Sequence, residues 1–299
     1  MADEITHKEV IAGLGTDEKA RLLARSDRAG LLHLAGHAGA ILITGTIIAL
    51  KLPLWWLVLP LHGIFLVFLF TLCHECTHQT PFRSRMLNEA VGHLSGALIL
   101  LPFLWFRYFH LAHHRHTNDP ENDPELTSDA KPETWGQYLI HLTGWGYWAG
   151  NFATLFSNAL GAMDAPYLPS ARHGDMIREA RWLLALYSLV LLSLLISPLA
   201  FWLWVLPLLL AQPVLRLYLL AEHGRCPPVA NMLENSRTTF TTAAIRFLAW
   251  NMPYHIEHHS YPNVPFQHLP ALHRHMAPYL KSTSPGYMAF TEDYVRHLK

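Results

Sequence analysis

The sequence predicts an all-α integral membrane protein, and two observations carry this prediction. Of the 299 residues, 51% are hydrophobic and only 15% are charged, whereas soluble proteins average about 25% charged residues. In addition, four stretches are apolar enough to cross a bilayer core of about 30 Å, which needs roughly 20 helical residues. These expected transmembrane helices cover residues 31–50, 54–73, 182–197 and 199–221.

The connections between these stretches predict two helical hairpins. Lys51-Leu52-Pro53 joins the first pair and Ser197-Pro198 joins the second, so each pair should form a tight hairpin that returns to the side it left. Only Lys51 marks the far side, whereas the open ends are rich in Lys and Arg. The positive-inside rule therefore predicts a multi-pass protein with both termini in the cytosol, in the inner membrane if the protein is bacterial.

We expect one membrane domain over residues 1–299, with a cytosolic N-terminal tail (1–30) that contains no apolar core of a cleavable signal peptide. The first hairpin (31–73) is followed by a cytosolic or interfacial part (74–181), the second hairpin (182–221) and a cytosolic C-terminal part (222–299). The formal net charge is zero and no basic stripe is present, which argues against a nucleic-acid partner.

Three segments of the middle part have their own expected roles. The run Leu94–Phe106 is too short to span, so it should be re-entrant or interfacial. Trp135–Leu160 is rich in aromatic residues and predicts either an amphipathic interfacial helix or a packed cytosolic core helix. Thr117–Glu125 is rich in turn residues and predicts a solvated acidic loop, with partner docking as the alternative.

Three histidine clusters dominate the chain: His74 with His78, then His110, His113 and His114, then His255, His258 and His259. Residues three and four positions apart lie on one side of a helix, so each cluster should present its imidazoles together. Eight imidazoles exceed the three or four ligands of a single zinc site and suffice for two metal ions. We expect iron, because iron supports the O₂ chemistry that breaks an unactivated C–H bond.

Two other classes of protein also fit single features. His74-Glu75-Cys76-Thr77-His78 matches the H-E-x-x-H signature of zinc proteases, in which the Glu is the general base. An intramembrane protease, however, leaves the other two clusters without a role. A metal transporter should carry ionisable groups inside its spans, and only four occur there: His33, His37, His62 and Arg216. Cys73, Cys76 and Cys226 are expected to be reduced thiols with a packing role.

The ordered set of three histidine boxes between two hairpins resembles the membrane fatty acid desaturase superfamily, over roughly Leu31–Tyr279. This superfamily includes acyl desaturases, alkane hydroxylases, and carotenoid hydroxylases and ketolases. The resemblance implies a four-helix membrane stalk and a cytosolic helical cap that hold two non-haem iron ions, with O₂ as co-substrate. It also implies that the eight histidines are metal ligands and that His223, in Leu220-Ala-Glu-His-Gly224, is a ninth.

The chain departs from the acyl-CoA desaturases of this superfamily at two positions. Leu219 stands where acyl-CoA desaturases have an Asn, and the first box has three intervening residues, as in lipid desaturases and carotenoid-modifying members. Histidine spacing does not distinguish desaturation from hydroxylation, because both begin with the same C–H abstraction. Desaturation of a fatty acyl or related aliphatic chain is the expected function, with hydroxylation or ketolation of a hydrocarbon or carotenoid as the alternative. No electron-transfer module fits in the chain, so a separate donor of the ferredoxin, rubredoxin or cytochrome b5 type, with its reductase, should supply electrons.

Several residues around the boxes have expected supporting roles. Glu75, Glu222 and Glu257 each adjoin an expected ligand, and carboxylates commonly orient metal-bound imidazoles. Asn251 could act likewise or cap a helix. Gly96 and Ala97 could form the closed end of a substrate tunnel, or they could only permit close helix packing. Six further histidines are expected at the surface or behind the ligands: His93, His116, His141, His268, His273 and His275.

Overall fold

The computed structural model describes residues 5–128 and 130–299, and helices make up most of this part of the chain. The predicted helical class is therefore confirmed, with one small addition: β1 (Thr238–Thr239) and β2 (Thr283–Ser284) form a short parallel pair. The α-helices, in chain order, are α1 (His7–Ala12), α2 (Thr16–Leu22), α3 (Asp27–Ala49), α4 (Trp55–Val67), α5 (Leu69–Thr77), α6 (Arg85–Leu98), α7 (Phe103–His116), α8 (Pro124–Ser128), α9 (Trp135–Thr143), α10 (Trp145–Leu160), α11 (His173–Ser193), α12 (Leu206–His223), α13 (Met232–Asn235), α14 (Ala243–Leu248), α15 (His255–Ser260), α16 (Leu269–Met276) and α17 (Tyr287–Arg296). Short 3₁₀ helices occur at Ser170–Arg172, Phe266–His268 and Ala277–Tyr279, and a π-helix at Phe201–Val205 leads into α12.

Three helical stretches are long and apolar enough to cross a membrane: Thr16–Ala49, Trp55–Thr77 and Phe201–His223. They contain three of the four expected transmembrane segments. The fourth, residues 182–197, is not among them. Most of it belongs to α11, which begins at His173 and carries Asp175, Arg178, Glu179 and Arg181 in its first half, so its uncharged part is short.

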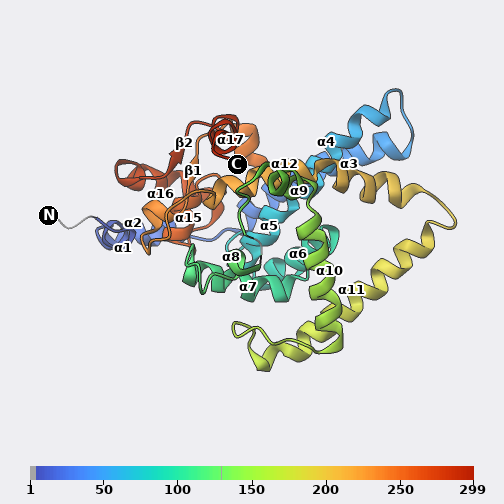
Figure 1. Ribbon diagram of the computed structural model, residues 1–299, viewed down its shortest axis with the longest axis horizontal. Coiled ribbons are helices and arrows are strands. Elements are labelled where there is room, and N and C mark those ends of the chain that lie inside the picture. The colour runs from blue at the N-terminus through green and yellow to red at the C-terminus, as the bar shows by residue number, and fades with distance from the viewer. Residues whose placement is uncertain (1–4, 129) are drawn as a thin grey trace.

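The second expected hairpin is not a tight helix pair. Helix α11 packs against α10, whereas α12 packs against α4 and α9, and α11 and α12 diverge in Figure 1. The reason is the periodicity of the buried residues of α11. Ala180, Leu183 and Tyr187 follow one stripe of the helix and contact Leu155 and Ala159 of α10. In the first hairpin, by contrast, α3 and α4 do pack together.

The run Leu94–Phe106 is not one helix. Helices α6 and α7 meet there at an angle of 100°, and the turn between them contains Leu100 in a left-handed conformation (φ 57°) followed by Pro102 at the N-cap of α7. Gly96 of α6 packs closely against this turn, since a Cβ atom on Gly96 would lie only 2.5 Å from the carbonyl oxygen of Leu101. Such a sharp bend suits a re-entrant segment or a broken span.

Trp135–Leu160 is also broken, at Gly144. This glycine has φ 70° and touches the side chain of Gln212, which leaves no room for a Cβ atom. The two resulting helices, α9 and α10, expose a row of large apolar side chains, and such a surface suits contact with lipid better than with water. The exposed residues are Trp135, Leu139, Ile140, Trp145, Phe152, Phe156 and Leu160.

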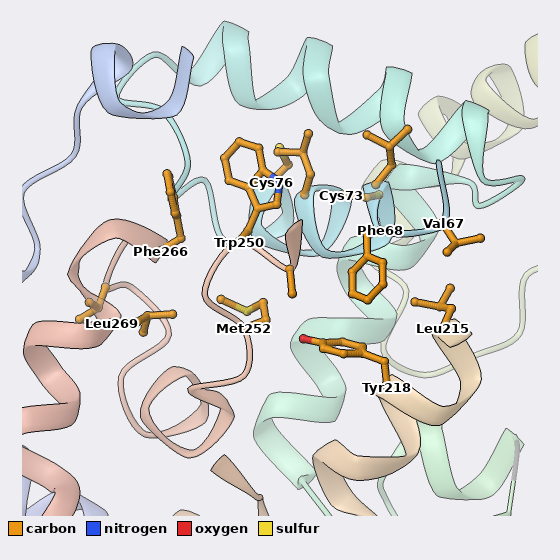
Figure 2. Close-up of a cluster of buried hydrophobic side chains, with 14 of the residues drawn as sticks. Val67, Phe68, Cys73, Cys76, Leu215, Tyr218, Trp250, Met252, Phe266 and Leu269 are labelled. Carbon is orange, nitrogen blue, oxygen red and sulfur yellow. The ribbon is translucent and has the colours of Figure 1, made fainter. Parts of the chain in front are cut away.

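The main hydrophobic cluster joins the helical stalk to the C-terminal part of the chain. Figure 2 shows Phe68, Leu215 and Tyr218 from α12 and the α4–α5 junction opposite Met252 and Phe266 from the C-terminal part. The free cysteines Cys73 and Cys76 are fully buried in it. In Figure 1 the helices α15 to α17 and the short strands gather at one end of the molecule, and the far ends of α3, α4 and α11 extend from the other. The histidines lie where these two parts meet.

Candidate metal centre

The nine expected ligands come from four parts of the chain that meet in space. His74 lies in α5 and His78 directly after it, three histidines lie in the last two turns of α7, His223 ends α12, and three lie in α15. Eight of the nine are buried, with exposures of 8% or less, and His114 is half-buried. The buried residues are His74, His78, His110, His113, His223, His255, His258 and His259.

The histidines divide into two clusters. The first cluster consists of His74, His78, His110, His114 and His258, which can each offer one nitrogen within 4.8 Å of the others. A second such group consists of His113, His223 and His259. The Nε2 atom of His255 lies 2.9 Å from Nε2 of His223, so we include His255 in the second cluster.

The nitrogen atoms within each cluster are arranged as metal ligands would be. Nε2 of His78 lies 2.8 Å from Nε2 of His110, and Nε2 of His114 lies 3.1 Å from Nε2 of His258. Neither ring nitrogen of His74 has a hydrogen-bond partner among the described residues. Burial holds the pKa of His255, His258 and His259 well below the ordinary value of 6.5, so these imidazoles are neutral. Neutral imidazole is the form that binds a metal, and the donor sets fit two ions.

Three hydrogen bonds orient the second cluster, and their partners were not expected from the sequence. Nδ1 of His113 lies 2.9 Å from a carboxylate oxygen of Asp123, Nδ1 of His259 lies 3.1 Å from the hydroxyl of Thr117, and Nδ1 of His223 lies 3.1 Å from the carbonyl oxygen of Asn235. A partner on Nδ1 leaves Nε2 to face a metal.

Asp123 corrects one part of the expectation of a solvated acidic loop over Thr117–Glu125, since residues 120–122 are exposed as expected but Asp123 is not. This side chain is buried. Its carboxylate accepts hydrogen bonds from the backbone N–H groups of Asn118 and Glu125 and also contacts His113. The acidic composition of the tract hides this role. The only sequence signal is its position ten places after His113, within the turn-rich tract Thr117–Glu125.

The four residues expected to support the ligands differ in position. Glu222 lies 3.5 Å from Nδ1 of His255, and Glu75 lies 3.6 Å from Nδ1 of His258. Both distances exceed that of a good hydrogen bond. Glu257 turns away from the adjacent ligands, because its two carboxylate oxygens contact His273 and the hydroxyl of Thr238.

Asn251 contacts none of the nine histidines through its amide, which donates to the carbonyl oxygen of Phe266 at 3.0 Å. Its backbone N–H donates to the carbonyl oxygen of Arg246 and closes the C-terminal end of α14. The N-cap of α15 is Tyr254. Asn251 therefore has the second of the two expected roles, a role at a helix end. It lies at the C-terminal end of α14, however, and not at the start of α15.

Two of the other histidines contact carboxylates away from the clusters, His93 that of Glu179 and His275 that of Glu18, each at 2.8 Å. His273 pairs with Glu257, as described above. His141 is different, because it lines a cavity that adjoins the expected ligands. This placement was not apparent from its isolated position in the sequence.

A cavity of about 260 Å³ adjoins both clusters. Its lining includes imidazoles of both clusters, from His74 and His110 of the first and from His113, His223 and His255 of the second. Aromatic and apolar residues form much of the remaining lining: Phe70, Leu101, Trp105, Phe106, Phe109, Tyr167 and Leu219. Polar and charged residues line it as well, among them Glu125, Lys131, Asn151, Arg216 and Glu222. Neither Gly96 nor Ala97 lines it. Gly96 packs against Leu101, and Ala97 lines a separate groove with Trp182 and Leu183, so the tunnel role expected for these two residues is wrong.

Glu75 does not line the cavity either. One of its carboxylate oxygens accepts a hydrogen bond from the hydroxyl of Thr80 at 2.9 Å, and the side chain is fully buried behind His258. A protease of the H-E-x-x-H type needs this Glu in contact with a water beside the substrate. The geometry therefore disfavours the protease alternative.

Comparison with known proteins identifies relatives that match most of the chain. The chain is 27% identical over 246 residues to an sn-1 acyl-lipid omega-3 desaturase (ferredoxin) of Nostoc sp. (strain 36), which covers 73% of this chain and 65% of that protein. It is 27% identical to the chloroplastic omega-3 fatty acid desaturase of Brassica napus (72% of this chain, 59% of that protein) and 27% identical to the dihydrorhizobitoxine desaturase of Bradyrhizobium elkanii (78% and 70%). The model of the fatty acid desaturase family matches residues 20–291. The chain belongs to the fatty acid desaturase family.

Proposed function

We propose that this protein is an O₂-dependent di-iron oxidoreductase that desaturates a fatty acyl or related aliphatic chain. The observation that carries the proposal is the cavity, whose lining combines imidazoles of both clusters with several aromatic and apolar side chains. Family membership supports an oxidoreductase of the desaturase type.

The first cluster would hold one iron ion through His74, His78, His110, His114 and His258. The second would hold another through His113, His223, His255 and His259. Iron in these sites would supply the O₂ chemistry that removes hydrogen from an unactivated C–H bond. The residues of this chain supply orientation: Asp123, Thr117 and the carbonyl oxygen of Asn235 fix the ring positions of the second cluster.

The apolar walls of the cavity would hold an aliphatic chain and exclude water from the reacting carbon. Phe106 and Phe70 lie at ring-centroid distances of 5.6 Å from His110 and 6.5 Å from His74, so a chain that passes them comes next to the ligands. Burial of apolar surface would stabilise the bound chain by about 0.8 kcal/mol per methylene.

We also propose where the enzyme is located and which protein donates its electrons. The three candidate spans would embed the protein in a bilayer. Both termini would lie in the cytosol, as the distribution of Lys and Arg predicts, with residues 182–197 as a fourth crossing before α12 and with α6 and α7 as a re-entrant pair that does not cross. Two electrons would come from an external donor. Ferredoxin is a reasonable first choice, because the name of the Nostoc relative includes it, and rubredoxin and cytochrome b5 remain alternatives.

The test combines metal analysis with product analysis. Purified protein should contain close to two iron atoms per chain. Cells that express it should accumulate lipids that have lost two hydrogens, as detected by mass spectrometry against cells that express His258→Ala. A product that gains an oxygen atom would instead assign hydroxylation. One zinc ion per chain, with proteolysis that depends on Glu75, would overturn the proposal.

A further inference from the structure

Helix α10 buries two amide side chains although its exposed face is apolar. Trp145, Phe152 and Leu160 are exposed, whereas Asn151 is 8% exposed and Asn158 is 2% exposed. A buried polar side chain needs a hydrogen-bond partner, because burial removes the partners that water offers. The partners of these two amides therefore need to be identified.

Asn151 has no hydrogen-bond partner of normal geometry for its amide nitrogen, which is buried. This statement covers the described residues. The amide approaches the hydroxyl of Tyr147, one turn earlier in α10, but the two groups do not form a hydrogen bond of normal geometry. The Tyr147 hydroxyl donates its own hydrogen to the carbonyl oxygen of Ile99 at 3.0 Å. The Asn151 side chain, which has donor and acceptor atoms, is therefore available to a ligand.

Asn151 lines the cavity of about 260 Å³ beside the histidines. Thr154, one turn later on the same face of α10, lines it as well, and so does Gly150. The space at Gly150 is open, because a Cβ atom there would meet no other atom within 4 Å. An open space and a buried amide without a partner thus lie together in one lining.

Aromatic side chains of the same lining offer a surface for an aliphatic chain. The ring centroid of Phe109 lies 4.9 Å from that of Trp105 and 6.0 Å from that of Tyr167, so the three rings form a continuous group. Contact with such rings removes apolar surface from water and favours an apolar ligand. The cavity therefore suits a ligand that is apolar over most of its length and has one polar group.

The amide indicates that this polar group is neutral. An amide forms hydrogen bonds but supplies no opposite charge, so it compensates poorly for the hydration that an ionised group loses on burial. The charged residues of the lining belong to other segments: Glu125 and Lys131 pair with each other, and Arg216 and Glu222 lie in α12. A neutral carbonyl oxygen, by contrast, is satisfied by a single N–H donor.

We propose that Asn151 binds the carbonyl oxygen of a neutral end group, an ester or an amide, on a ligand whose aliphatic chain lies in the cavity. The N–H group of Asn151 donates to this oxygen, and Trp105 and Phe109 contact the chain. That the chain reacts at the histidines rests on the proposed function. Under that function, Asn151 is a positioning residue that fixes which carbon of the chain lies beside the histidines.

Direct binding tests this contact without any reaction. Full-length protein in detergent micelles is incubated with radiolabelled methyl decanoate, N-methyldecanamide or undecane, which have chains of similar length. Asn151→Leu keeps the size of the side chain and should weaken binding of the ester or the amide about five- to a hundredfold, because the buried carbonyl loses its donor. Binding of undecane should not weaken. Each affinity is compared with that of the wild-type protein for the same ligand, so partition into the micelles cancels.

Asn158→Leu is the matched control. Asn158 lies two turns further along α10, and its buried amide nitrogen also lacks a partner among the described residues, but it does not line this cavity. This variant should bind all three ligands as the wild-type protein does. Elution as a single species on size exclusion and retained binding of undecane show that each variant is folded. Asn151→Ala, which also removes the amide, takes the place of Asn151→Leu if the leucine variant aggregates.

Each outcome supports or removes the proposed role. Selective weakening of methyl decanoate identifies an ester as the end group, and selective weakening of N-methyldecanamide identifies an amide. Equal weakening of undecane, an equal effect of Asn158→Leu, or unchanged binding of both carbonyl ligands overturns the proposal. Tighter binding of decanoate than of its methyl ester, lost in Asn151→Leu, would also overturn it, because the bound group would then be ionised. Since binding needs neither iron nor turnover, failure of the desaturase proposal would appear separately, in the iron content and the products.

Discussion

The first and second histidine clusters lie side by side but are supported in different ways. In both, rings pack against rings: the centroid of His74 lies 4.1 Å from that of His110, and the centroid of His255 lies 4.5 Å from that of His259. In the first cluster Glu75 lies 3.6 Å from a ring nitrogen of His258, too far for a good hydrogen bond. In the second cluster, loop residues hold the rings by hydrogen bonds, as Asp123 and Thr117 do.

The loops that support the second cluster are themselves tied together. The amide of Asn118 donates to the carbonyl oxygens of Cys226 and Asn235, and the amide of Asn235 donates to the carbonyl oxygen of Thr117. The first cluster therefore depends on helix packing, and the second on a network of hydrogen bonds between segments distant in sequence. This difference implies that mutations behind the second cluster can weaken one metal site and leave the other intact.

The largest expected effect is the loss of a ligand from the first cluster. His258→Ala removes a fully buried imidazole that lies 3.1 Å from His114 and is close to His74, so iron content should fall well below two per chain and activity should be lost. His297→Ala, at an exposed position near the C-terminal end of α17, should change neither. Full activity in His258→Ala would exclude His258 as a ligand.

A smaller and more selective effect is expected at Asp123. Asp123→Asn removes the charge behind His113, and loss of such a partner weakens metal binding by about 10- to 100-fold. In a chelator titration of this variant, one iron per chain should be lost at a lower chelator concentration than in the wild-type protein. The other iron should be lost at the same chelator concentration as in the wild-type protein. Asp119→Asn, in the same loop but partly exposed and bonded only to neighbouring loop residues, is the control. Simultaneous loss of both ions would show that the clusters do not differ in support.

Thr117→Val should have a weaker effect in the same direction. It removes the hydroxyl 3.1 Å from Nδ1 of His259 and preserves the size of the side chain. A single neutral hydrogen bond contributes about 0.5–1.5 kcal/mol, so the chelator concentration that removes the more labile iron should fall about two- to tenfold. An effect as large as that of Asp123→Asn would mean that Thr117 holds the loop as a whole.

No effect on iron is expected from filling the cavity. Gly150 lines the cavity beside the histidines, and a Cβ atom there would meet no other atom within 4 Å. Gly150→Leu should therefore leave both irons in place and shift the preferred substrates towards shorter chains, as measured by product analysis of mixed acyl substrates. Gly39→Leu also adds a side chain into open space, on α3 outside this cavity, and should not change the products. Unchanged preference in Gly150→Leu would place the substrate elsewhere.

The sequence by itself determined the helical class, three of the candidate spans and the identity of the expected ligands. These features depend on local patterns: apolar length predicts a span, and histidines three and four residues apart share a helix face. His223 could be named only through a resemblance, because it stands alone in its helix. The breaks at Leu100 and Gly144 were missed, since they depend on close contacts with Gly96 and Gln212 rather than on helix propensity.

Only the tertiary structure decided how the histidines divide, what supports them and where a substrate could lie. His113 meets His223 across 110 positions of sequence, and Thr117 meets His259 across 142. The cavity joins residues of α5, α7, α10, α12 and α15, and it leaves out Gly96 and Ala97. Local periodicity fixes the face on which a side chain lies but not which other face it meets, because that depends on packing of the whole chain.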